Sequence, residues 1–308
     1  MSTTTVKASV LHGIRDLRVE WREIPPPGPS ELQVSVRSTG ICGSDQHYYN
    51  HYRNGDILIR EPMSLGHESS GMVEAVGSDV PEGSFKVGDR VALEVGLACG
   101  TCELCTEGRY NICRSMSFRS SAKSFPHFQG TLQQRINHPA QWCHRLPESV
   151  SLTEGALLEP LSVAIHGVRR SQLSGTKTAL VLGAGAVGLL TSAMLRVEGA
   201  SKIVIADIDP QRVDFATQNE FADVGFAVPL KQGATIEAKL AIAQETAKLA
   251  TTAAGLCGFD AVFECTGVET CVQTAIYVRL TSSSVQVLIP IQKVTDLAVN
   301  RPLAPEAE

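Results

Sequence analysis

The chain has 308 residues, of which 43% are hydrophobic and 19% are charged, and its formal net charge is −5. At roughly 150 residues per domain, these values predict two folded domains and exclude a disordered chain. The negative charge argues against nucleic acid or an anionic membrane surface as the main partner, because neither attracts a negative protein. The sequence has no apolar run of about 18 residues and no apolar signal region at its start, so we expect a cytoplasmic protein.

Short strand-like runs separated by turn residues fill the first 150 residues. Three of them are LQVSVRS (32–38), GMVEAVG (71–77) and DRVALEV (89–95). Runs rich in β-branched residues and bounded by turn signals are typical of antiparallel strands. We therefore expect a barrel-type β domain over residues 1–150.

Three dispersed residues in this half each offer one metal ligand. Cys42 lies in GICGSDQH, and His67 and Glu68 are adjacent in LGHESSG. Thiolate, imidazole and carboxylate together suit a catalytic zinc whose fourth position stays open to water or substrate. Spacing alone leaves an alternative, because a lone cysteine and a lone histidine on strands are often core residues.

A cluster of four cysteines is the strongest local signal. It consists of Cys99, Cys102, Cys105 and Cys113. Thiolates on such short, glycine-bearing spacers can surround Zn²⁺ tetrahedrally and leave no position for water, and a reducing compartment favours metal over disulfides. We predict a structural zinc site, with four free or casually paired thiols as the alternative. The remaining cysteines lack ligand spacing and are expected in the core: Cys143, Cys257, Cys265 and Cys271.

The pattern changes in the second half of the chain. A helical segment, 151–176, connects the two halves, and from about Lys177 apolar strands alternate with helical stretches. This alternation is typical of a doubly wound parallel sheet, here a Rossmann domain over 177–290.

A glycine-rich loop follows the first apolar strand of this domain. Its sequence is Gly183-Ala184-Gly185-Ala186-Val187-Gly188, and a helix follows it. In this context Gly183 allows the tight turn, Gly185 lets the backbone approach a pyrophosphate, and Gly188 permits close packing of helix on strand. The N–H groups at the start of the helix, which include Ala186 and Val187, would face the phosphates.

An acidic residue ends the next strand. Asp207 stands 24 residues after Gly183, where a carboxylate accepts hydrogen bonds from the adenosine ribose and repels a 2′-phosphate. We therefore expect NAD rather than NADP. Arg212 could instead attract a phosphate, but beside Asp207 we interpret it as covering the adenosine end, and we expect Asp209, before Pro210, to be a helix cap or turn residue.

The motifs of the first half resemble those of a known family. The pattern Gly66-His67-Glu68-x2-Gly71-x5-Gly77-x2-Val80 is similar to the signature of the zinc-containing medium-chain alcohol dehydrogenases, and the four cysteines stand where that family has them. The stretches 42–48 and 159–164 are most similar to its polyol branch, the sorbitol and xylitol dehydrogenases. The resemblance covers roughly residues 6–277.

The resemblance implies a GroES-like catalytic domain followed by a Rossmann domain, with one catalytic and one structural zinc. Cys42, His67 and Glu68 correspond to the catalytic zinc ligands, and Glu159 corresponds to an acid at the fourth position, bound directly or through water. The implied reaction is oxidation of a secondary alcohol of a polyol to a ketose, with hydride transfer to NAD⁺.

Helix residues after Cys42 gain roles from the same resemblance. Ser44 corresponds to a hydroxyl that relays the proton, with His47 as a next carrier. Asp45 matches an acid that orients His67, and Tyr48 matches a tyrosine of the polyol pocket. For Ser44, Asp45 and Tyr48 the alternative is a turn or barrel-surface residue.

Two rival functions remain at this level. One is a different zinc alcohol or threonine dehydrogenase. The other is a catalytically impaired chain that only binds zinc and nucleotide. The second rival is motivated by the C-terminus, where the resemblance stops after Tyr277.

Beyond that point SVQVLIPI can supply a fifth parallel strand, but nothing later in the sequence resembles the family's sixth strand or closing stretch. We therefore expect an incomplete Rossmann domain, a divergent tail at 291–308, and no edge strand for the family's homo-oligomer.

Overall fold

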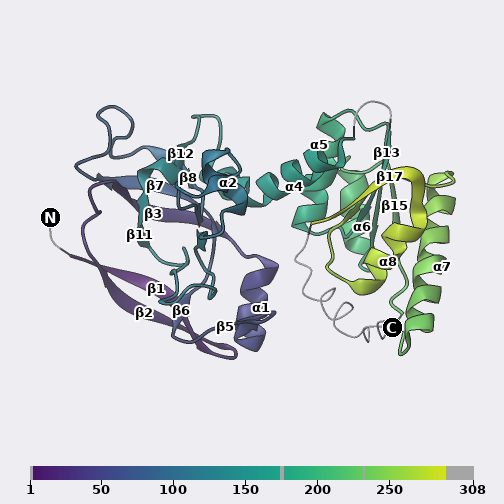
Figure 1. The fold of residues 1–308 in the computed structure, drawn as a ribbon, viewed down its shortest axis with the longest axis horizontal. Helices are drawn as coiled ribbons and strands as arrows, with labels where there is room; N and C mark the ends of the chain where they lie inside the picture. Colours follow the sequence, from purple (N-terminus) through teal and green to yellow (C-terminus); the bar gives the residue numbers. More distant parts are fainter. Residues whose placement is uncertain (1–2, 174–176, 232, 289–308) are drawn as a thin grey trace, which may run out of the picture. The chain divides into compact units, whose positions relative to one another are not determined.

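The computed structural model describes residues 3–173, 177–231 and 233–288. It divides into two compact units, Met1–Glu159 and Pro160–Glu308. We describe each unit by itself (Figure 1).

The first unit is built from antiparallel strands. They form a five-stranded sheet of order β11-β3-β7-β8-β12, a three-stranded sheet of order β2-β1-β6, and the pairs β9–β10 and β4–β5. The strand bounds are β1 (Thr4–Gly13), β2 (Asp16–Ile24), β3 (Glu31–Gly40), β4 (Arg53–Asn54), β5 (Ile57–Leu58), β6 (Met63–Ser64), β7 (Glu68–Val76), β8 (Arg90–Leu93), β9 (Gly96–Leu97), β10 (Ser117–Phe118), β11 (Arg135–Pro139) and β12 (Cys143–Arg145).

Short helices connect these strands. They are α1 (Gly43–His51), α2 (Glu103–Thr106), η1 (Tyr110–Ile112), η2 (Ala140–Trp142) and α3 (Leu152–Ala156), and α4 (Leu158–Ser171) begins at the end of this unit. The longest ladder in the five-stranded sheet joins β3 to β7, where Val34 pairs with Val73. Both valines are buried in one apolar cluster with Val91 and Leu93 of β8, so burial of one sheet face holds these strands together.

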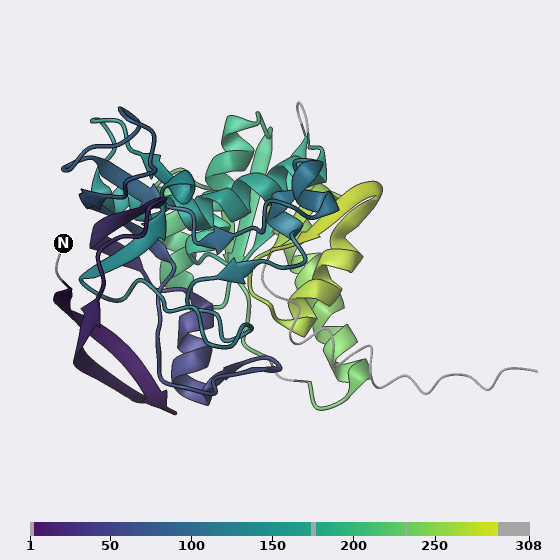
Figure 2. The same cartoon turned by 60° about the vertical axis from the view of Figure 1, so that its left-hand side comes forward.

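The β1–β2 hairpin, coloured purple in Figures 1 and 2, belongs to the three-stranded sheet. Leu11 of this hairpin joins a second cluster, in which it packs with Met63 and Leu65 around Tyr48 of α1. This packing fixes α1, and with it the segment that carries Cys42.

The second unit contains a five-stranded parallel sheet of order β15-β14-β13-β16-β17. Its elements are β13 (Thr178–Leu182), α5 (Ala186–Val197), β14 (Lys202–Asp207), α6 (Pro210–Gln218), β15 (Val224–Ala227), α7 (Ile236–Ala254), β16 (Phe259–Glu264), α8 (Glu269–Val278) and β17 (Arg279–Val287).

Successive side chains of each strand point to opposite faces of this sheet, and both faces are buried. Val181 packs toward α4, α5 and α6, whereas Leu182 packs toward α7 and α8. The chain runs outward from β13 to β15 and then returns to β16 on the other side of β13. The carboxyl ends of β13 and β16 therefore form the switch point at which open α/β sheets bind ligands.

The structure confirms the predicted fold class, with antiparallel strands first and a doubly wound parallel sheet second. The expected barrel is built from the three-stranded and five-stranded sheets, which residues 132–134 connect: the N–H of Ser9 in β1 donates to Leu132, and that of Val36 in β3 donates to Gln134.

The strand expected at 71–77 begins earlier, at Glu68, and the expected fifth parallel strand is β17, which ends at Val287. The predicted tail at 291–308 lies outside the described residues.

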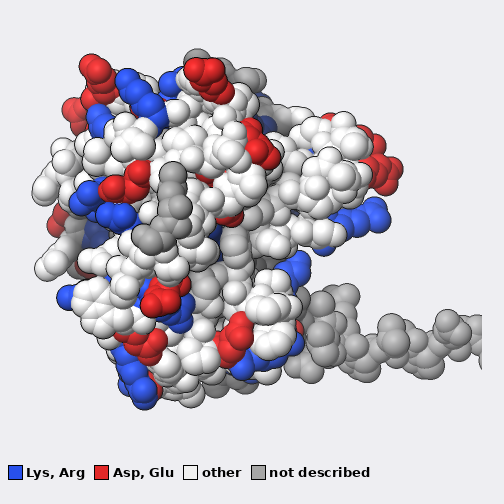
Figure 3. All heavy atoms as spheres, turned by 90° about the vertical axis from the view of Figure 1, so that its left-hand side faces the viewer, with Lys and Arg blue, Asp and Glu red and all other residues white. Residues whose placement is uncertain are grey.

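No helix in the described part of the chain is long and apolar enough to cross a membrane. Acidic and basic side chains are intermingled on the face that Figure 3 shows, and neither sign forms a continuous patch there.

Candidate active site and zinc centre

Pairing of β3 with β7 brings the three dispersed ligand candidates together. Gly40 at the end of β3 lies opposite Glu68 at the start of β7. Cys42 follows β3 as the N-cap of α1, and His67 immediately precedes β7. One ligand atom from each of Cys42, His67 and Glu68 lies within 4.8 Å of the others.

Asp45 organises the backbone around this group. Its carboxylate accepts hydrogen bonds at 3.0 Å from the N–H of Cys42, the N–H of Gly66 and the hydroxyl of Ser120. Its Oδ1 lies 3.6 Å from Nδ1 of His67, which is too long for a hydrogen bond but close enough for electrostatic attraction. Asp45 therefore holds the two chain segments that carry the ligand candidates.

His67 is buried, and its Nδ1 has no hydrogen-bond partner among the described residues. Burial acts to lower the pKa of this imidazole, but its interactions with the neighbouring Asp45 and Cys42 raise the pKa to about 10. Burial raises the pKa of Glu68. A sulfur, a nitrogen and an oxygen donor gathered where His67 is buried and Cys42 and Glu68 are half-buried, with one polar atom unpartnered, fit a zinc ion.

Glu159 lies in the first turn of α4 and is partly buried. Burial and the neighbouring carboxylates Glu68 and Asp45 raise its pKa to about 7, although His67 acts in the opposite direction. Glu159 is therefore electrostatically coupled to the group, but it is not among the residues whose ligand atoms lie within 4.8 Å of one another.

The other predicted residues lie on α1. Ser44 is partly exposed in its first turn, and the exposed His47 has its ring 6.0 Å from that of His51. Tyr48 is only 2% exposed, and its hydroxyl accepts a hydrogen bond from the N–H of Ala122 at 3.2 Å. The contact of Tyr48 with substrate stays a prediction.

Gly40 is a site residue that the sequence argument missed. A Cβ atom at Gly40 would overlap Oε2 of Glu68. Its signal was a glycine inside a strand pattern, which often marks a close approach. Gly40 leaves the space in which the Glu68 carboxylate lies.

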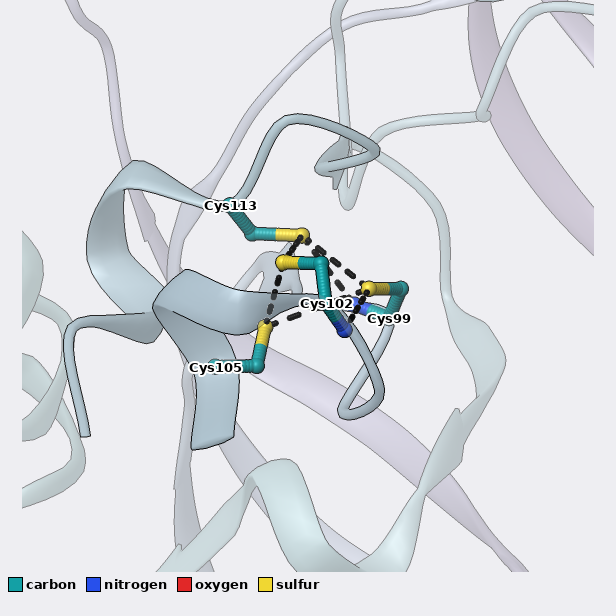
Figure 4. Close-up of side chains that lie close together, drawn as sticks. All are labelled: Cys99, Cys102, Cys105 and Cys113. Atoms are coloured by element: carbon teal, nitrogen blue, oxygen red, sulfur yellow. Dashed lines mark hydrogen bonds between the residues drawn. The ribbon is translucent and has the colours of Figure 1, made fainter. Parts of the chain in front are cut away.

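The four clustered cysteines point their sulfur atoms toward one another (Figure 4). The Sγ–Sγ distances are 3.5 Å for Cys99–Cys113 and Cys102–Cys105, and 3.9 Å for Cys99–Cys105 and Cys102–Cys113. Four sulfurs placed tetrahedrally at 2.3 Å from zinc would be about 3.8 Å apart. Backbone N–H groups of Thr101 and Cys102 lower the pKa of Cys99 to about 6, which favours the thiolate form that binds metal. The cluster fits a closed zinc site.

The glycine-rich loop follows β13 at the switch point of the parallel sheet. Gly183 has a φ of +102°, and a Cβ at Gly188 would overlap the carbonyl oxygen of Gly183. Gly185 is the N-cap of α5, where a Cβ would meet nothing within 4 Å. The loop thus has a tight turn, close helix packing and open space before the first N–H groups of α5, which fits a bound pyrophosphate.

Asp207 lies at the end of β14 and holds this loop. Its Oδ2 accepts the N–H of Ala184 at 2.7 Å, and its Oδ1 accepts the N–H of Asp209 at 2.9 Å. Asp209 is the N-cap of α6, as predicted, and accepts the N–H of Gln211. Arg212 lies 3.7 Å from Asp209 with its side chain largely exposed.

Glu264 is a buried carboxylate at the end of β16, next to the switch point, and it was not predicted from the sequence. Glu264 ends β16 with no exposed surface, and it accepts the N–H of Thr266 at 2.7 Å and that of Gly267 at 3.1 Å. The Thr266 methyl carbon would lie 2.9 Å from a Cβ on Gly183. Glu264 therefore fixes the turn that packs against the glycine loop.

Comparison with known proteins agrees with this fold. Residues 28–148 match the family model of the alcohol dehydrogenase GroES-like domain. D-xylulose reductase A of Aspergillus niger is 42% identical over 284 residues, which cover 90% of this chain and 75% of the relative. L-idonate 5-dehydrogenase of Vitis vinifera is 38% identical over 269 residues, covering 87% of this chain and 69% of the relative.

A solved structure has a similar fold. The crystal structure of L-idonate 5-dehydrogenase from Escherichia coli has a TM-score of 0.77 and 29% identity, and the match covers 92% of this chain and 75% of that one. An identity above 40% over most of the length of D-xylulose reductase A shows that the two proteins belong to one family. The chain belongs to the polyol branch of the zinc-containing medium-chain alcohol dehydrogenase family.

Proposed function

We propose that this chain oxidises a secondary alcohol of a small polyol, of the sorbitol or xylitol type, to a ketose and transfers the hydride to NAD⁺. The observation that carries the proposal is the group formed by Cys42, His67 and Glu68, whose ligand atoms lie within 4.8 Å of one another. The relatives named for xylulose and idonate support a polyol substrate.

In this proposal the first unit is the zinc and catalytic domain, and Cys42, His67 and Glu68 hold the catalytic zinc. When bound, the zinc supplies a Lewis acid that stabilises negative charge on the alcohol oxygen, from which hydride leaves readily. The partly buried Glu159 is the acid at the fourth position. The four clustered cysteines hold the structural zinc and keep their lobe folded.

Residues of α1 would transfer the proton of the alcohol to water. Ser44 stands two residues after Cys42 at the start of the helix, and it takes the proton that the alcohol loses. The exposed His47 passes this proton to water. Asp45 keeps Cys42 and His67 in place through its hydrogen bonds to the backbone of Cys42 and Gly66.

The second unit would bind NAD. Gly183, Gly185 and Gly188 with the N–H groups of Ala186 and Val187 hold the pyrophosphate. Asp207 binds the ribose hydroxyls, and Arg212 covers the adenosine end. All nine cysteines are free, which suits the reducing cytoplasm proposed for this enzyme.

The function is tested by measuring NADH formation from sorbitol, xylitol, L-arabinitol and threonine, each with NAD⁺ and NADP⁺. We expect turnover of at least one polyol with NAD⁺ and about two zinc atoms per chain. Turnover of threonine alone would point to the other branch of the family. NADH binding without any turnover would identify a chain that only binds metal and nucleotide.

Two variants separate the metal sites. His67→Ala should abolish turnover while NADH binding stays nearly intact, because the glycine loop belongs to the other unit. Cys99→Ser should remove about one zinc per chain and lower stability without changing the turnover of folded molecules. An equal loss of turnover per folded molecule in Cys99→Ser would contradict the structural role of the cysteine cluster.

A further inference from the structure

Ser120 has a backbone conformation that serine rarely adopts. Its φ is +62°, in the left-handed region, and the residue is only 4% exposed. The N–H of Ser120 donates to the carbonyl oxygen of Phe128 at 2.9 Å. A left-handed conformation is unfavourable for a residue that carries a Cβ atom, so it persists only where the surrounding structure imposes it, and such residues gather at functional sites.

Arg119, the preceding residue, anchors this conformation in the first unit. Its N–H donates to the carbonyl oxygen of Val95 at 3.1 Å. Its buried guanidinium donates to Nδ1 of His138 at 2.9 Å and to the carbonyl oxygen of Gln129 at 3.0 Å. The backbone at Ser120 is therefore held by the residue before it and by its own N–H group, which gives its side chain a fixed direction.

The hydroxyl of Ser120 donates to Oδ1 of Asp45 at 3.0 Å. The Asp45 carboxylate also accepts the backbone N–H groups of Cys42 and Gly66, but these belong to the segments that carry the ligand candidates. Ser120 belongs to neither segment, and the contacts of Arg119 set its position. Its hydroxyl therefore fixes the carboxylate relative to the rest of the unit, whereas the two backbone donors would move with the ligands.

Two further contacts join the same short stretch of chain to this group. The ring of Phe118 meets the ring of His67 edge-on, with 5.5 Å between the two centroids. The N–H of Ala122 donates to the hydroxyl of Tyr48 on α1 at 3.2 Å. Every second residue of this stretch, with Ser120 in the middle, thus contacts either a ligand candidate or the buried side of α1.

We propose that Ser120 is a positioning residue of the catalytic zinc site. Its hydroxyl fixes the Asp45 carboxylate, which in turn holds the backbone of Cys42 and keeps a negative charge 3.6 Å from Nδ1 of His67. This inference rests on the proposed function, because that function assigns the zinc to Cys42, His67 and Glu68. Ser120 itself offers no ligand. Residues that orient metal ligands change metal affinity about 10- to 100-fold.

Two substitutions remove the hydroxyl but differ in their effect on the backbone. Ser120→Ala keeps the strained φ, whereas Ser120→Gly relieves it, because glycine adopts a positive φ readily. We expect Ser120→Gly to unfold at a higher temperature than Ser120→Ala. We expect both variants to bind zinc at the catalytic site about 10- to 100-fold more weakly than the wild type, because both lack the bond to Asp45.

Competition with a chromophoric zinc chelator measures the affinities of the two zinc sites in the full chain. His67→Ala, which lacks a ligand of the catalytic zinc, shows which of the two constants belongs to that site. The constant of the four-cysteine site should be the same in every variant. Visible absorption of Co²⁺ bound at the catalytic site reports on the arrangement of its ligands, and it should change in both Ser120 variants.

Ser35→Ala is the matched control. Ser35 is 5% exposed in the same unit, and its hydroxyl donates to the carbonyl oxygen of Met72 at 3.3 Å rather than to a residue that holds a ligand candidate. Loss of this buried hydrogen bond should lower the unfolding temperature. Both zinc affinities and the Co²⁺ absorption should stay as in the wild type.

The two Ser120 variants distinguish a positioning role from a merely structural one. Equal losses of zinc affinity at different unfolding temperatures support the proposal. A zinc affinity that falls in Ser120→Ala and recovers in Ser120→Gly overturns it, since the affinity would then follow the stability of the fold. An affinity that is unchanged in both variants overturns it as well. A wild-type chain that binds zinc only at the four cysteines overturns the proposed function itself, and with it the role of Ser120.

Discussion

Gly40 at the end of β3 lies opposite Glu68 at the start of β7, and a methyl group on Gly40 would overlap the Glu68 carboxylate. The overlapped oxygen is at the end of a flexible side chain. The strand pairing can therefore survive an added methyl group, whereas the position of the carboxylate cannot. Gly40 thus controls the site without offering a ligand.

Gly40→Ala should displace the Glu68 carboxylate from Cys42 and His67. We expect zinc content to fall from about two atoms per chain to about one, and turnover to fall about 10- to 100-fold, as for other residues that orient metal ligands. NADH binding should be unchanged. Metal analysis, the NADH-formation assay and NADH titration measure the three quantities.

Gly43→Ala is the matched control. Gly43 stands in the first turn of α1, and a Cβ there would meet nothing within 4 Å. This variant should keep both zinc atoms and its turnover. Full zinc and full turnover in Gly40→Ala would show that the Glu68 carboxylate tolerates displacement and is not held by the space at Gly40.

Motifs whose chemistry is local could be predicted from the sequence. The spacing of Cys99, Cys102, Cys105 and Cys113 determines that short loops can bring four sulfurs together, and the structure places them 3.5 to 3.9 Å apart along four of their edges. The conformation of the glycine loop likewise follows from residues that are adjacent in the chain. The N-cap role of Asp209 follows from the proline after it.

Features that depend on tertiary packing could not be predicted. Nothing near Gly40 in the sequence indicates that Glu68 will lie against it, because the β3–β7 register brings them together. Nothing in the sequence around Glu264 indicates that it is buried, because its burial depends on the turn in which the N–H of Thr266 donates to its carboxylate. Which side of α1 faces the core depends on packing as well, and the structure places Tyr48 on that side.

Tyr48→Phe tests that placement. Removing the hydroxyl leaves the buried N–H of Ala122 without its acceptor, a loss on the order of 1–3 kcal/mol in the free energy of unfolding. We expect a lower unfolding temperature and an unchanged KM for the polyol. Tyr49→Phe is the control, because Tyr49 is 37% exposed and should tolerate the change. A raised KM at normal stability would return Tyr48 to the substrate pocket.

Asp207→Ala should change the choice of cofactor. The carboxylate that would bind the ribose and repel a 2′-phosphate is lost, a change on the order of 1–3 kcal/mol in relative preference, so the ratio of NAD to NADP efficiency should fall at least several-fold. Because Asp207 also accepts the N–H of Ala184, we expect weaker binding of NADH as well.

Asp209→Ala provides the comparison for this change. Loss of the α6 cap should cost about 0.5–2 kcal/mol in stability and leave the cofactor ratio unaltered. A ratio that changes in Asp209→Ala and not in Asp207→Ala would transfer the ribose contact to Asp209.

The stability of the first unit should decline in acid because of one buried histidine. His138 is fully buried, its Nδ1 accepts a hydrogen bond from Nε of Arg119 at 2.9 Å, and its Nε2 lies 3.0 Å from the carbonyl oxygen of Glu94. Nδ1 cannot take a proton while the Arg119 guanidinium donates to it. Burial, with the Arg119 charge, lowers the pKa of His138 to about 3.

Because the pKa of His138 is lowered in the folded chain, the folded state loses stability as the pH falls. Below the ordinary histidine pKa the unfolded chain binds a proton at residue 138 that the folded chain does not, so stability is complete above about pH 6.5 and falls by about 1.4 kcal/mol per pH unit between there and pH 3. His138→Gln should be less stable at pH 7. Between pH 3 and 6.5 its free energy of unfolding should change less per pH unit than that of the wild type, by about 1.4 kcal/mol. Urea unfolding followed by tryptophan fluorescence reports on the correct unit, since both tryptophans, Trp21 and Trp142, lie in it.

His144→Gln is a control with the opposite sign, because His144 contacts the side chain of Glu94, whereas His138 contacts the backbone carbonyl of Glu94. His144 lies 2.8 Å from the Glu94 carboxylate, and hydrogen bonding to that carboxylate raises the pKa of His144 despite partial burial. Its contribution to stability is therefore present below the ordinary histidine pKa and is lost as pH rises through the raised value. Zinc release in acid affects the wild type and both variants alike. The contribution of each histidine is therefore measured as the difference between the variant and the wild type in the free energy of unfolding at each pH. Equal pH slopes for the wild type and His138→Gln between pH 4 and 6.5 would mean that His138 takes up its proton in the folded state.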